Sequence, residues 1–114
     1  MNKQKIDLKT KKVIDIFIKK IAEQYHFSGA ILFGSRARQT HKIGSDLDLA
    51  ILLQGVPGKF IAIKLAMDDI AYLVMLDTGI RIQLLPIWES EWKHPENYSN
   101  PRLLENIQRE GIPL

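Results

Sequence analysis

Two short motifs of this chain combine residue types that bind phosphate with residue types that bind metal ions. Gly34 and Ser35 follow the apolar run 30–33, and ten residues separate Ser35 from the sequence Asp46-x-Asp48. Glycine lets a backbone approach an anion closely, and a serine hydroxyl can cap the next turn or donate to a phosphate. Together, the two motifs predict a phosphate-binding turn beside a metal site.

Asp46 and Asp48 are expected to project from one face of a strand, because successive side chains of a strand alternate between its faces. Repulsion between the two carboxylates is unfavourable without a cation, and hard oxygen ligands suit Mg²⁺ better than Zn²⁺. Residues 49–53 are apolar on both faces, as expected of a central strand covered by helices. We therefore predict that both carboxylates bind the metal; the alternative is that they only solvate a loop.

Three polar residues around the motifs are candidates for supporting roles. Arg36 and Arg38 lie in a segment of helix-forming composition, and either could pair with phosphate oxygens. Ser45 is expected to orient Asp46 or to cap its loop, which turns at Gly44. A triphosphate bridged to the carboxylates by Mg²⁺ would fit this set, with Arg36 stabilising charge on the leaving pyrophosphate.

The segment 33–49 resembles the signature of the DNA polymerase β nucleotidyltransferase superfamily, in its minimal, single-domain MNT branch. The resemblance implies that Gly34 and Ser35 hold the β and γ phosphates of a nucleoside triphosphate, and that Asp46 and Asp48 bind Mg²⁺. It implies transfer of a nucleoside monophosphate, AMP from ATP, to a hydroxyl acceptor. It also implies a third carboxylate on the following strand.

That third carboxylate is where the chain departs from the family pattern. The next strand is expected at 80–86, and the acid would align with Gln83. An amide can offer a neutral oxygen to a metal, but it can neither balance the metal's charge nor accept a proton. Asp77 and Glu89 are possible substitutes. Gln39 is a second departure, because relatives carry glycine there.

The resemblance also suggests a biological context, in which single-domain MNT proteins are the antitoxin halves of HEPN/MNT modules. The transferase then modifies or binds a small helical HEPN-type partner, with a tyrosine hydroxyl as the usual acceptor. A rival interpretation is a catalytically weakened domain that only binds a nucleotide or a partner, because of Gln83. Transfer to a small molecule is a third, although nothing in the chain resembles the extra acceptor domain of those relatives.

The elements that must position the motifs follow from apolar spacing and turn residues. Helices are expected at 8–25, 58–77 and 101–110, with Asn100 as the cap of the last. The second helix has more apolar residues than one buried face needs, which leaves packing within the chain or a dimer or heteromeric interface open. Residues 88–101 are expected to form a surface loop. Its three large aromatic residues either stack on a base or seal a core edge, and His41 either reaches phosphate or is a solvated loop residue. The aromatic residues are Trp88, Trp92 and Tyr98.

Composition limits the class of protein. The chain has 114 residues, 46% hydrophobic and 25% charged residues, no cysteine and a formal net charge of +3. These values predict a single domain over 1–114 in a cytoplasmic protein. The expected strands and helices, with no repeat or linker between them, predict the α/β (α+β) class, with a small mixed sheet and helices packed against it. The small charge excess makes nucleic acid an unlikely partner, and no apolar run approaches the length of a membrane span.

Overall fold

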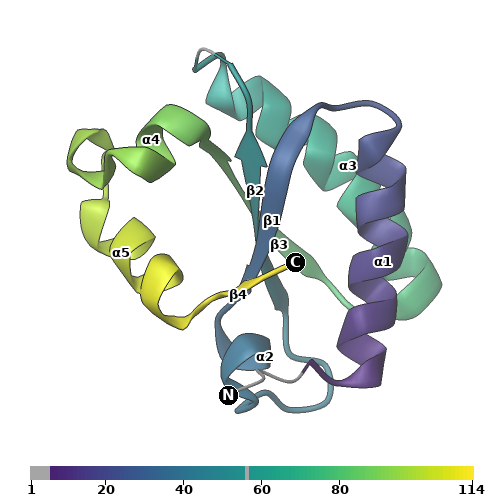
Figure 1. Ribbon diagram of the computed structural model, residues 1–114. Coiled ribbons are helices and arrows are strands. Elements are labelled where there is room, and N and C mark those ends of the chain that lie inside the picture. The colour runs from purple at the N-terminus through teal and green to yellow at the C-terminus, as the bar shows by residue number, and fades with distance from the viewer. Residues whose placement is uncertain (1–5, 56) are drawn as a thin grey trace.

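A mixed sheet of four strands forms the centre of the computed structural model, which describes residues 6–55 and 57–114 (Figure 1). The strands are β1 (Phe27–Phe33), β2 (Leu47–Leu53), β3 (Ile82–Trp88) and β4 (Ile112–Pro113), in the order β3-β2-β1-β4. β1 is antiparallel to β2 and to β4, while β2 and β3 are parallel. The predicted α+β class is confirmed, and so is the predicted adjacency of the two strands that carry the motifs.

Two long helices cover one face of the sheet (Figure 1). α1 (Leu8–Ala22) begins at Asp7, whose carboxylate accepts a hydrogen bond from the Thr10 backbone N–H at 3.1 Å. α3 (Phe60–Thr78) connects the parallel strands β2 and β3 and ends at Gly79, whose φ of +78° suits the left-handed end of a helix. Both helices match the predicted ones to within a few residues. Their apolar side chains pack on Leu47, Leu49 and other inward residues of β2.

The opposite face is covered by the C-terminal part of the chain. It contains α4 (Glu89–Lys93), a short 3₁₀ helix at Pro95–Asn97 and α5 (Pro101–Glu110). The predicted terminal helix is confirmed at both ends, and Asn100 caps it by accepting from the Leu103 N–H. Leu104 and Ile107 of α5 pack against Ala50, on the face of β2 that also carries Asp48.

The predicted loop over 88–101 was wrong in part. β3 continues past Pro86 to Trp88, and two short helices occupy most of the following segment. The α4 helix begins with the Glu91 carboxylate accepting the Trp88 N–H at 3.0 Å, a local hydrogen bond that a search for apolar periodicity does not detect. Within the described residues, no helix is both long and apolar enough to cross a membrane.

Candidate nucleotidyl-transfer site

The turn after β1 places Gly34 directly against Asp48. Gly34 has φ +74° and precedes the single-turn helix α2 (Ser35–Arg38). A Cβ at Gly34 would overlap the carboxylate of Asp48, so only glycine allows this approach. Phe33 and Asp48 are paired in the antiparallel ladder of β1 and β2, which fixes the contact from both strands.

Asp46 and Asp48 lie at the start of β2, both partly buried. Burial raises the pKa of Asp48, and the neighbouring charge of Asp46 raises it further, while the guanidinium of Arg38 lowers it. This effect of Asp46 on Asp48 indicates that the two carboxylates lie near each other. The structure therefore brings together the two predicted metal ligands in a partly desolvated position, where a divalent cation would relieve their repulsion.

Gln83 lies beside both carboxylates. It is paired with Asp48 in the parallel ladder of β2 and β3, and its Nε2 donates to Asp46 Oδ2 at 3.1 Å. Arg81, the residue just before β3, has its Nη1 3.7 Å from the same oxygen. An amide and a guanidinium thus occupy the place where the family pattern expects a third acid.

Neither acid considered as a substitute joins this group. Glu89 follows Trp88, which pairs with Leu53 at the far end of β2 from Asp46, about 20 Å away along the strand. Asp77 is exposed near the end of α3. Across residues 6–55 and 57–114, no three His, Cys, Asp or Glu side chains are arranged to hold a metal ion.

The chain is similar to known proteins in sequence and in fold. Residues 17–114 match the protein family described as Polymerase beta, Nucleotidyltransferase. The chain belongs to this nucleotidyltransferase family. A similar fold occurs in the crystal structure of a candidate nucleotidyltransferase from Sulfolobus solfataricus, with a TM-score of 0.51, 17% identity and coverage of 81% of this chain and 84% of that one. No protein among curated sequences matches significantly.

The two arginines of α2, Arg36 and Arg38, have different surroundings. Arg36 is 3% exposed; its Nε and Nη2 donate to the Ser45 carbonyl at 3.1 and 2.9 Å, and its Nη1 donates to Thr10 Oγ1 at 2.7 Å. Arg38 is exposed, acts on the pKa of Asp48, and has its Nη1 3.6 Å from Glu110 of α5. Arg36 therefore fixes the loop, and phosphate binding by it would compete with these contacts. Of these two arginines, Arg38 is the one that is accessible to a ligand.

The loop between the two motifs is held by local hydrogen bonds. The Ser45 hydroxyl accepts from the Lys42 N–H at 2.9 Å, and the Ser45 N–H donates to the Lys42 carbonyl at 3.0 Å. Ser45 thus caps its loop, one of its two predicted roles. The loop turns at Gly44, as predicted, with φ +86°. Gln39 has φ +60°, the left-handed conformation that explains why glycine would suit this position better.

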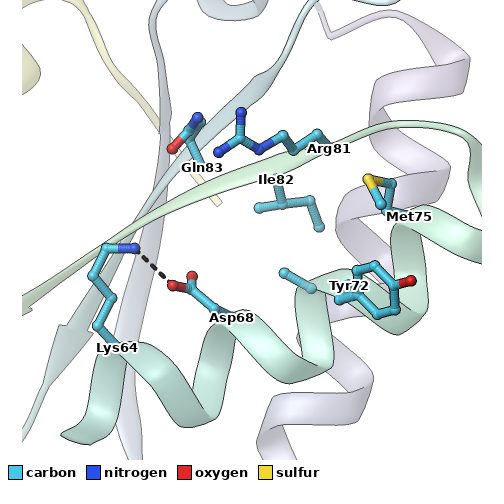
Figure 2. Close-up of a pocket in the computed structure, with 8 residues that line it drawn as sticks. Lys64, Asp68, Tyr72, Met75, Arg81, Ile82 and Gln83 are labelled. Carbon is cyan, nitrogen blue, oxygen red and sulfur yellow. Dashed lines mark hydrogen bonds and ion pairs between the residues drawn. The ribbon is translucent and has the colours of Figure 1, made fainter. Parts of the chain in front are cut away.

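A hollow of about 210 Å³ extends the site toward α3, and apart from Gln83 its residues were not predicted to belong to the site (Figure 2). Lys64 and Asp68 of α3, joined by an ion pair of 2.8 Å, lie on one side, and Arg81 and Gln83 at the start of β3 lie on the other. The signal available in the sequence was the spacing of four residues between Lys64 and Asp68 and the alternation of Arg81 with Gln83.

The aromatic residues seal core edges. Trp88 is buried in the main core, and Trp92 and Tyr98 pack partly buried against the second apolar cluster. Trp88 also lies at the far end of the sheet from Asp46. His41 is partly buried, and its Nε2 is 3.3 Å from the Asp7 carboxylate at the start of α1.

Proposed function

We propose that this protein is a Mg²⁺-dependent nucleotidyltransferase that transfers AMP from ATP to a hydroxyl acceptor. The observation that carries the proposal is the convergence of Asp46, Asp48 and Gly34 at one end of β2 in a chain of the nucleotidyltransferase family. The family supports nucleotidyl transfer in general. The choice of Mg²⁺, ATP and a hydroxyl acceptor is our inference from the donor chemistry and the sequence resemblance.

The donor set fits Mg²⁺. Asp46 and Asp48 offer carboxylate oxygens, and Gln83 can offer its amide oxygen if its side chain rotates by half a turn from the present bond to Asp46. When bound, Mg²⁺ would neutralise the phosphates and the two carboxylates together. Arg81 offsets part of the negative charge at Asp46, and the neutral Gln83 amide adds none, so we expect metal affinity to be lower than in a site with three carboxylates.

The remaining residues position the substrate. Gly34 and Ser35 would hold the β and γ phosphates, and Arg38 is placed better than Arg36 to interact with the pyrophosphate that leaves. An oxygen–phosphorus bond forms between the acceptor and the α-phosphate while the bond to pyrophosphate breaks. The acceptor's proton must go to a carboxylate or to water, because the Gln83 amide cannot take it.

A second candidate function is a catalytically weakened domain that binds nucleotide or a partner protein. The specific observation in its favour is that Gln83 and Arg81 both engage Asp46 Oδ2, at 3.1 and 3.7 Å. An enzyme that relies on a third carboxylate would lose a metal ligand or a base here. In this case, the fold keeps a nucleotide site whose turnover is slow.

We further propose that the acceptor is a protein, in a module of the HEPN/MNT antitoxin type, in the cytoplasm. The support is the resemblance of segment 33–49 to the minimal nucleotidyltransferases of such modules. If a small helical protein is encoded beside this one, co-expression of the two provides the test. We expect the mass of that protein to increase by one nucleoside monophosphate with the wild-type transferase and to stay unchanged with Asp48→Asn. An unmodified partner with both the wild-type protein and the variant would contradict transfer and favour the binding-only function.

A further inference from the structure

The exposed side of α3 carries an apolar stripe that the chain itself does not cover. Ile61, Leu65, Tyr72, Leu73 and Leu76 are each between 55% and 66% exposed. Spacings of four and seven residues place Ile61, Leu65, Tyr72 and Leu76 on one side of the helix, over a length of about 22 Å. Exposed apolar patches of this kind mark interaction sites more often than chance surface.

Other helices of the chain do not share this character. The exposed residues of α1 are mostly lysines. The large apolar residue that is exposed on α1 is Leu8, the first residue of the helix. A helix that is apolar on both sides is expected to be buried on both sides. The buried residues of α3, which pack on the sheet, account for one side only. They are Met67, Ile70, Ala71 and Val74.

A carboxylate interrupts the stripe near its middle. Asp69 is exposed on the same side of the helix as Leu65 and Leu76, and within the described residues no ion pair involves it. Asp68 next to it pairs with Lys64 at 2.8 Å. α3 contains three aspartates and one lysine, so this surface is negative in a chain whose formal net charge is +3.

This charge disfavours a second copy of the chain as the occupant. A symmetric antiparallel pairing of two α3 helices would match Ile61 with Leu76 and Leu65 with Tyr72, and would therefore bring Asp68 and Asp69 of both copies together at the twofold axis. Like charges in an interface oppose association. The same geometry favours a partner that supplies a positive charge at the centre of an apolar surface.

We propose that the α3 stripe is a docking surface for an amphipathic helix of another protein, with a basic residue that meets Asp69. The proposal does not depend on nucleotidyl transfer, because Asp69 lies outside the site at Asp46 and Asp48. The hollow beside Asp68 and Tyr72 is continuous with Gln83, so a docked helix would lie next to the site.

Two synthetic helices test the proposal by fluorescence anisotropy. Both have a leucine face, and they differ only in a central arginine or glutamate. We expect the wild-type protein to bind the arginine peptide about tenfold more tightly, and Asp69→Lys to reverse this preference. Leu65→Ser should weaken binding of the arginine peptide about tenfold, whereas the matched control Leu8→Ser should not.

Three results would overturn the proposal. These are equal affinity of the wild-type protein for the two peptides, absence of binding to both, or self-association in sedimentation velocity that Leu65→Ser abolishes. The last result would assign the stripe to a second copy. Circular dichroism of each variant confirms that it is folded. Because binding is measured without nucleotide, failure here is distinguishable from failure of the proposed catalytic function.

Discussion

The two sides of the candidate site differ in how closely they follow the family pattern. On the side of β1 and β2, Gly34 lies against Asp48 and Arg36 holds the Ser45 carbonyl, so the backbone is fixed by buried contacts. On the side of β3, Arg81 is exposed and Gln83 is only partly buried, and both donate toward Asp46. The side proposed to bind phosphate and metal therefore keeps the residues of both motifs, and the side on which a third acid was expected carries Gln83.

From this difference, we expect binding and turnover to depend on different parts of the site. We expect the two carboxylates and the glycine turn to hold a metal and a triphosphate, and proton removal and a second metal to need an acid on β3. The following experiments perturb the two sides separately.

The largest effect is expected at Gly34. Gly34→Ala combines a strained φ of +74° with overlap on Asp48, and it should lower the free energy of unfolding by about 3 kcal/mol in urea denaturation. Gly55→Ala is the matched control, with φ +93° and no atom within 4 Å of the added Cβ, and should cost only about 1 kcal/mol. If both variants lose the same stability, the Gly34–Asp48 contact is not tight.

Arg36 and Arg38 give the next contrast. Arg36→Ala leaves the Thr10 hydroxyl and the Ser45 carbonyl without their buried donor, and should cost about 2–3 kcal/mol of stability. Arg38→Ala removes an exposed side chain and should change stability by less than about 0.5 kcal/mol, while weakening nucleotide binding. Equal stability losses, with nucleotide affinity affected only by Arg36→Ala, would reverse the assigned roles.

Gln83→Asp restores an acid to the β3 side. It replaces the amide that donates to Asp46 and adds a ligand and a base, so transfer activity or Mg²⁺ affinity should rise about tenfold. Gln83→Asn is the control, because it shortens the side chain without adding charge. High activity of the natural protein, unimproved by Gln83→Asp, would show that this side needs no third acid.

A smaller effect is expected from the charge of Asp48 on stability. Its folded pKa is raised above the ordinary 3.8, so the folded state binds the proton more tightly than the unfolded chain. The contribution of Asp48 to stability should therefore be greatest below that value, and should be lost as pH rises through the folded pKa. Asp48→Asn should raise Tm by a few degrees at pH 7 without Mg²⁺, and this gain in Tm should vanish as the pH is lowered toward 3.8. A gain in Tm that does not depend on pH would show that the charge of Asp48 does not destabilise the fold. Asp77→Asn, at an exposed acid, is the control.

Sequence patterns were sufficient for features with local causes. The bounds of α5 follow from Asn100, Pro101 and Gly111, and the facing strands of the two motifs follow from their apolar runs. The resemblance to the nucleotidyltransferase superfamily aligned Gln83 with the third acid, and the parallel pairing of β2 and β3 places Gln83 beside Asp48.

Features with distant causes could not be predicted. Arg36 is buried because Thr10, 26 residues away, accepts from its guanidinium, and no spacing rule links the two. The pairing of Arg81 with Asp46 depends on the register of β2 and β3. β4 has two residues, too few for any periodicity, and forms because α5 returns the chain to β1.

We propose that Asp46 and Asp48 form a working site for Mg²⁺ and nucleotide. Titration calorimetry with a non-hydrolysable ATP analogue, in Mg²⁺ and in EDTA, tests it with the wild-type protein and Asp48→Asn. We predict binding that requires Mg²⁺ and that Asp48→Asn weakens about a hundredfold or more, in a variant that remains folded. Equal affinity of the folded variant, or wild-type binding that EDTA leaves unchanged, would contradict the claim.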